Sequence, residues 1–100
     1  MANKARYHQA SNDIPGWKKL STEMKGRYFC WRLKSEGSWT GNYTVVVSYN
    51  AGKRRWGGVK VATISYQFDN IYDAEECRSW WREYNPNCSV HILQEVYHGT

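Results

Sequence analysis

The spacing of apolar residues near the start of the chain predicts a short helix over residues 13–25. Asn12 or Asp13 can accept its first free backbone N–H groups, and Pro15 suits the first turn because the N–H that proline lacks needs no partner there. Gly26 is a typical helix end. Four apolar side chains recur every three or four residues and therefore share one face of this helix: Ile14, Trp17, Leu20 and Met24.

Beyond this helix the pattern changes to a period of two, which predicts strands. Residues 27–33 form the first strand, with Phe29, Trp31 and Leu33 on one face. Residues 43–49 give the strongest strand signal of the chain, because β-branched and aromatic residues alternate along the segment. The central part of the chain is therefore expected to form a sheet.

A hairpin is predicted after the strand at residues 43–49. Residues 50–52 fit a tight turn, in which Gly52 adopts the positive φ that a bulged three-residue loop needs. The third strand then begins at Lys53 or later and ends near Phe68, and the glycine pair at residues 57–58 interrupts it with a bulge or a wider loop.

A second helix and a last strand complete the pattern. Asp73 and Glu76 have the spacing of a capping box at the helix start, and Pro86 prevents the helix from continuing. A strand is predicted over residues 88–97, where apolar and polar residues alternate. The apolar face of this second helix consists of Ala74, Cys77, Trp81 and Tyr84, widened by Trp80.

The predicted order is α-β-β-β-α-β, which indicates an α+β fold. We expect an antiparallel sheet of three to four strands with two helices packed on one side, the final strand joining a three-stranded meander. The other face of the sheet is then available to solvent or to a partner. One hundred residues provide one core, so we expect a single α+β domain over residues 12–100 and a flexible basic tail over residues 1–11.

Composition and cysteine count indicate a cytoplasmic globular protein that does not enter a membrane. Apolar residues make up 41% of the chain and charged residues 23%, as in folded domains. No apolar run approaches the roughly 18 residues of a membrane span, and the first residues lack the apolar stretch of a secretion signal. Three cysteines, Cys30, Cys77 and Cys88, are an odd number, which favours reduced thiols, although a disulfide between Cys77 and Cys88 stays open.

The charge distribution is asymmetric and suggests a polyanionic partner. The net charge is +5, yet residues 1–60 hold twelve Lys and Arg against three Asp and Glu, whereas residues 61–100 hold two against six. Cations at the tip of a projecting two-stranded ribbon can contact phosphates on a nucleic acid; the alternative is a solvated loop that keeps a sheet edge from aggregating. The candidate nucleic-acid-binding residues are Lys53, Arg54, Arg55, Trp56 and Lys60, together with Arg32, Lys34, Lys18 and Lys19, and Lys25 and Arg27 add further charge.

Aromatic residues, 16% of the chain, are the second distinctive feature. On an open sheet face beside cations, rings can stack on bases, each contributing about 1–3 kcal/mol. Trp39 lies in a turn-like stretch that fits a core poorly, and we predict that Trp39 and Tyr43 contact a partner. The residues expected in the core are Trp17, Phe29, Trp31, Phe68 and Trp81, and the remaining rings expected on or beside the sheet are Tyr28, Tyr49 and Tyr66.

Catalytic and metal chemistry find little support in the sequence. Cys30 or Cys77 beside His91 would make a nucleophile and a base, but nothing in their spacing favours that arrangement. The chain has no Cys-x-x-Cys motif and no pair of histidines on one helical face. We therefore expect no enzyme, no cofactor and no metal site.

The favoured hypothesis is a small basic protein that binds DNA or RNA. It would contact phosphates through the Lys/Arg-rich hairpin and stack aromatic rings on bases, with low sequence specificity. The alternative is a non-catalytic protein-interaction module, such as a phage-type inhibitor or adaptor that docks on a larger host complex. The final strand is a candidate sheet edge, so oligomers formed by edge pairing are also expected.

Overall fold

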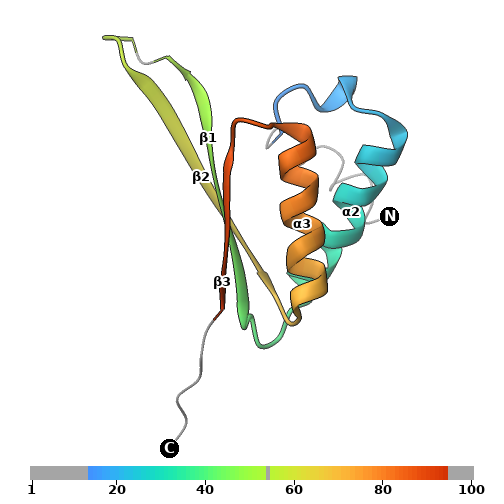
Figure 1. Cartoon of the computed structure of the whole chain (residues 1–100). Coiled ribbons are helices and arrows are strands. Elements are labelled where there is room, and N and C mark those ends of the chain that lie inside the picture. The colour runs from blue at the N-terminus through green and yellow to red at the C-terminus, as the bar shows by residue number, and fades with distance from the viewer. Residues whose placement is uncertain (1–13, 54, 95–100) are drawn as a thin grey trace, which may run out of the picture.

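Two α-helices lie on one face of a three-stranded antiparallel sheet (Figure 1). The computed structural model describes residues 14–53 and 55–94, apart from the side chain of Lys53, so the predicted tail and the predicted caps Asn12 and Asp13 lie outside the described residues. The predicted α+β class is confirmed, with the order α-β-β-α-β in place of α-β-β-β-α-β. Along the chain the elements are a 3-10 turn, η1 (Trp17–Lys19), then α2 (Thr22–Glu36), β1 (Tyr43–Lys53), β2 (Val59–Phe68), α3 (Ile71–Tyr84) and β3 (Ser89–Gln94).

β1 is the central strand of the sheet, between β2 and β3. It forms an antiparallel hairpin with β2 and pairs with β3 from Tyr43 to Ser48. The expectation that the final strand joins the sheet, with both helices on one side, is confirmed. Because side chains alternate along a strand, one face of the sheet contacts the helices and the other face stays open.

The predicted strand over residues 27–33 is wrong, because these residues lie inside α2. Their aromatic side chains favour strands locally. Tyr28 and Trp31, however, are three residues apart and share one helical face, where both are buried against rings of α3 and the sheet. The Ser21 side chain accepts the backbone N–H of Met24 and so caps the helix. Burial of a helical face therefore outweighs the local preference for a strand.

The predicted helix over residues 13–25 has the wrong bounds. Only the turn η1 forms there, and α2 then begins at Thr22 and continues through Gly26, the predicted stop. The shared apolar face nevertheless reaches the core, because four side chains are buried in it or pack against it: Ile14, Trp17, Leu20 and Met24.

The predicted hairpin turn at residues 50–52 is wrong, because these residues belong to β1. Ala51 is an extra residue in this strand, which makes a β-bulge. The Asn50 side chain accepts the backbone N–H of Gly52 at 2.8 Å and stabilises the irregular backbone. The pairs on either side of the bulge are Asn50 with Val61 and Gly52 with Lys60.

The chain reverses direction further along, between Lys53 and Val59. Gly57 and Gly58 have φ angles of 90° and 85°, in the left-handed region that glycine adopts without steric cost. The wider loop expected at the glycine pair is confirmed, and this loop is the turn of the hairpin. The turn thus lies further along the chain than predicted, which makes the hairpin longer.

Asn70, not Asp73, is the residue that caps α3. The Asn70 side chain accepts the backbone N–H of Asp73 at 3.0 Å, and its amide donates to the Asp73 carboxylate at 2.9 Å. Asp73 is thus the third residue of α3 and binds the side chain of the cap, and the predicted capping box of Asp73 with Glu76 is wrong. The helix ends at Tyr84, before the Asn-Pro pair that was expected to end it.

An aromatic core between the helices and the sheet joins the two layers. Trp80 of α3 lies near its centre, with ring contacts to Trp31 and Trp81. Its Nε1–H donates to the backbone carbonyl of Met24 at 2.7 Å and so connects α3 to α2. The predicted core is confirmed, because Trp17, Trp31, Phe68 and Trp81 are buried and Phe29 packs against them.

Replacing Gly26 by alanine should stabilise the protein. Gly26 lies inside α2, and a Cβ atom there meets nothing within 4 Å. Alanine loses less backbone entropy on folding, so we expect Gly26→Ala to raise the free energy of unfolding by about 0.5–1 kcal/mol. Urea denaturation followed by circular dichroism measures the change. Destabilisation would contradict the continuous helix through this position.

Candidate nucleic-acid interface

The β1–β2 hairpin projects beyond the rest of the fold as a two-stranded ribbon (Figure 1). We call residues 50–61 the β-arm. β3 pairs with β1 only as far as Ser48, so the β-arm has no third strand. Every described side chain of the β-arm is exposed. This segment is therefore free on both of its faces.

Two cations and a tryptophan extend from the β-arm. Arg55 and Lys60 are exposed, and no carboxylate of the described residues pairs with either one. Trp56 is 93% exposed. Lys53 is the last residue of β1, and Arg54 lies outside the described residues. The structure thus brings Arg55, Trp56 and Lys60 together on one projecting element.

Two cations of α2 are neutralised by acidic residues of α3. Arg27 donates to Glu76 at 2.7 Å and to Glu83 at 2.6 Å, and Lys34 pairs with Asp73 at 3.1 Å. The hydrogen bond with Glu76, reinforced by the one with Glu83, raises the pKa of Arg27 against the opposing effect of burial. These pairs join the two helices, and they make Arg27 and Lys34 less available to bind an external anion.

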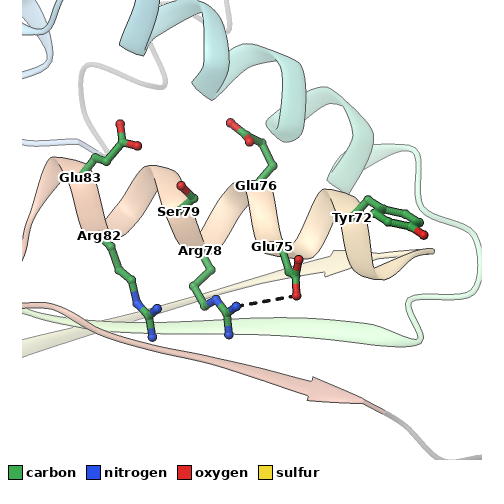
Figure 2. Close-up of a pocket in the computed structure, with 7 residues that line it drawn as sticks. All are labelled: Tyr72, Glu75, Glu76, Arg78, Ser79, Arg82 and Glu83. Carbon is green, nitrogen blue, oxygen red and sulfur yellow. Dashed lines mark ion pairs between the residues drawn. The ribbon is translucent and has the colours of Figure 1, made fainter.

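Figure 2 shows how charges are sorted around α3. Glu76 and Glu83 point toward α2, whereas Glu75, Arg78 and Arg82 lie on the opposite side of the helix. A surface hollow of about 560 Å³ along α3 is lined by both acidic and basic side chains. The mixed lining gives this hollow no preference for a polyanion.

The remaining candidate cations occupy different environments. Arg32 of α2 lies 5.7 Å from the ring centre of Tyr66 and pairs with Glu36 at 3.5 Å. Lys18 and Lys19 are exposed in η1, without an acidic partner among the described residues. Nζ of Lys25 lies 5.8 Å from the ring centre of Trp17. In place of the continuous positive field suggested by the sequence, the candidate cations without a described acidic partner lie on the β-arm, in η1 and at Lys25, whose ammonium lies over the Trp17 ring of η1.

The described part of the open face, away from the β-arm, has neither charged side chains nor large aromatic rings. Tyr43, Tyr49 and Tyr66 lie on the helix-covered face, and Tyr28 and Trp31 are in α2, so the expected stacking platform on the sheet is wrong. This part of the open face extends from Ser48 to the end of the sheet that lies opposite the β-arm. Its described residues are Thr44, Val46, Ser48, Thr63, Ser65, Gln67, Ser89, His91 and Leu93.

Trp39 lies in the loop between α2 and β1 and is 93% exposed. Asp69 fixes the backbone of this loop, because its carboxylate accepts the Thr40 backbone N–H at 2.8 Å, the Thr40 hydroxyl at 3.0 Å and the Gly41 N–H at 3.4 Å. Tyr43, the other predicted partner contact, is half-buried and packs against the core. Sequence reasoning missed Asp69, since a lone aspartate after a strand gives no sign of a loop 29 positions away.

The cysteines and His91 do not form a nucleophile–base pair. Cys77 is buried on the helix side of the sheet, where burial raises the pKa of its thiol and disfavours the reactive thiolate. His91 lies on the open face, and Cys30 is exposed on α2. All three cysteines are free thiols. Within residues 14–53 and 55–94, no group of three or more His, Cys, Asp or Glu is placed to bind a metal ion.

The chain matches no protein-family model, no curated protein and no solved structure. None of the helices in the described part of the chain is long and apolar enough to cross a membrane. The function must therefore be argued from the side chains described above.

The pKa of Asp69 tests the fixed loop around Trp39. Hydrogen bonds, with the Thr40 backbone N–H as the largest cause, hold this pKa below its ordinary value of about 3.9. The pKa is lower in the folded chain, so the stabilisation is present above about pH 4 and is lost as the pH falls through the folded value. NMR titration of the carboxyl carbon should show the lowered pKa.

A pair of variants locates the cause. Thr40→Val removes the hydroxyl donor and keeps the backbone N–H, so the pKa of Asp69 should rise part of the way toward its ordinary value. Thr63→Val, on the open face, should leave it unchanged. An Asp69 pKa at its ordinary value in the wild-type protein would mean that the loop is not held in this way.

Proposed function

We propose that the protein binds nucleic acid, DNA or RNA, through the β-arm, with low sequence specificity and without catalysis. The observation that carries the proposal is an exposed two-stranded ribbon on which Arg55 and Lys60 have no acidic partner among the described residues. Free thiols are consistent with a cytoplasmic location.

A two-stranded ribbon has suitable dimensions for a nucleic-acid groove, since the major groove of duplex DNA, about 12 Å wide, admits such an element. Arg55 and Lys60 then contact phosphates, and release of the counterions bound there supplies most of the affinity. Trp56, which no core contact requires, stacks on a base or a sugar. This combination favours affinity over sequence recognition.

Two lysines outside the β-arm extend the contact. Lys18 and Lys19 are exposed in η1, which lies toward the same end of the molecule as the β-arm in Figure 1. Lys34, by contrast, is paired with Asp73 and contributes little. The open face of the sheet has no charged residue between Thr44 and Ser48 or at the positions opposite them. This part of the face therefore offers no cation that could bind a phosphate.

Salt dependence of binding tests the role of the cations. In a plot of log affinity against log salt concentration, the Lys53/Arg54/Arg55 triple alanine variant should have a slope up to about three units shallower than the wild type, because three phosphate contacts are lost. Fluorescence anisotropy with labelled single-stranded and duplex oligonucleotides measures both slopes. A control in the same assay is Lys34→Ala, which should leave the slope nearly unchanged. A flat plot for the wild type would rule out the proposal.

The two exposed tryptophans provide a matched comparison. Trp56 and Trp39 are equally exposed, but only Trp56 lies on the β-arm. Trp56→Ala should weaken binding to single-stranded oligonucleotides by about 1–3 kcal/mol, the value of one stacked base. Trp39→Ala should have no effect in the same titration. Equal effects of the two substitutions would argue against a site on the β-arm.

Protein binding is the second candidate function, and Trp39 is the observation that favours it. Tryptophan is common among the residues that dominate interface energies, and Asp69 holds the backbone beside Trp39 in place. A module such as a phage-type inhibitor or adaptor of a host complex would use this side chain as an anchor. Purified protein free of nucleic acid, with a host complex retained by the wild type and lost by Trp39→Ala, would favour this candidate.

A further inference from the structure

β3 is an edge strand without the features that usually prevent pairing with another chain. Its outer edge has no partner strand within the described residues. The strand reads Ser-Val-His-Ile-Leu-Gln, without lysine, other charge or proline, and its register with β1 runs without a bulge. Natural edge strands usually contain one of these protections. β3 is therefore well suited to receive another strand.

The opposite edge of the sheet differs in one respect. β2 carries Lys60, and the guanidinium of Arg32 lies over the ring of its Tyr66. β2 therefore contains one charged residue and has a second charged group packed over one of its side chains, whereas β3 contains no charged residue. Of the two edges, β3 is the better site for strand addition.

We propose that two copies of this chain associate through β3, pairing antiparallel about a two-fold axis to form one six-stranded sheet. Residues directly opposite each other in an antiparallel pair point to the same face. Val90 and Ile92 of both copies therefore meet on the helix-covered face, where they already pack in or against the core. The two cores then continue across the junction.

The charges beside β3 identify a second copy as the partner. α3 packs on β1 and β3, and α2 packs on β2, so the side of α3 that faces away from α2 borders the β3 edge. Glu75 and Arg82 are on that side (Figure 2). α3 and β3 run in opposite directions (Figure 1) and have similar lengths, about 21 Å and 20 Å. The two elements lie alongside each other over the same part of the molecule (Figure 1), so their midpoints nearly coincide.

Two-fold symmetry converts this arrangement into charge complementarity. Glu75 lies before the midpoint of α3 and Arg82 after it. When two α3 helices run antiparallel across the axis, Glu75 of one copy faces Arg82 of the other, and the same pair forms again on the opposite side of the axis. A surface with these two charges on either side of its centre is complementary to itself. Glu75 already pairs with Arg78 of its own helix at 3.7 Å, and the second copy adds Arg82 as a further partner of each Glu75.

Sedimentation equilibrium over a range of concentrations tests the association. The wild type should form dimers. In His91→Lys/Leu93→Lys, like charges face each other whether His91 lies opposite its own copy or opposite Leu93, so the dissociation constant should rise about tenfold or more. The matched control is Thr63→Lys/Ser65→Lys, which adds the same charge to exposed positions on the same face of β2 and should dimerise like the wild type.

Exchanging the two charges on α3 tests whether the partner is a second copy. A folding defect could weaken the dimer, but it would not be corrected by the second substitution. Arg82→Glu should weaken the dimer because it places two acids opposite each other, and Glu75→Arg/Arg82→Glu should restore it. A wild type that is monomeric at every concentration would overturn the proposal, as would dissociation caused by the β2 variant instead of the β3 variant. Failure of the double exchange to restore the dimer would overturn the assigned pairing of α3. These measurements do not involve nucleic acid, so their failure is separate from a failure of the proposed function.

Discussion

Packing of aromatic rings between the helices and the sheet is the interaction on which the rest of the structure depends. Trp80 contacts rings of both layers and donates a hydrogen bond to the backbone of α2. This core takes up the tyrosines of the sheet, so the described part of the opposite face between Thr44 and Ser48 is left without charged side chains. Trp39 and Trp56 are the two tryptophans that the core does not use. Their exposure needs an explanation because the fold gains nothing from it.

Ion pairs between the helices decide where positive charge remains available. The excess of cations in the first part of the chain and of acids in the second part resembles a nucleic-acid-binding surface when only the sequence is considered. Folding places Glu76, Glu83 and Asp73 against Arg27 and Lys34, and the charges of the two parts largely cancel between α2 and α3. The β-arm lies beyond the reach of these acids. The same acids that stabilise the helix pair therefore neutralise Arg27 and Lys34, whereas the cations of the β-arm and of η1 have no acidic partner among the described residues.

The sequence was sufficient for the fold class, the strand at residues 43–49, the second helix and most of the core, because each depends on a local period or on side-chain size. It was insufficient for α2. Residues 27–33 alternate like a strand, but Tyr28 and Trp31 are both buried, with the three-residue spacing of a helical face. The sequence also could not predict that acids of α3 neutralise Arg27, or that Asp69 accepts hydrogen bonds from the loop at Trp39. Both depend on contacts between residues far apart in the chain, which no local pattern encodes.

The bulge at Ala51 has a consequence for the geometry of the β-arm. One additional residue in a strand shifts the alternation of all positions that follow it, so the sides on which they appear are interchanged. Removing Ala51 would return β1 to a regular ladder with β2 and reverse the phase of the strand beyond Asn50 without altering any cation. The side chains that share one side of the tip thus depend on whether β1 contains an odd or an even number of residues, as well as on the residue types. Natural variants of this protein that change the length of β1 by one would carry the same charges in a different spatial order.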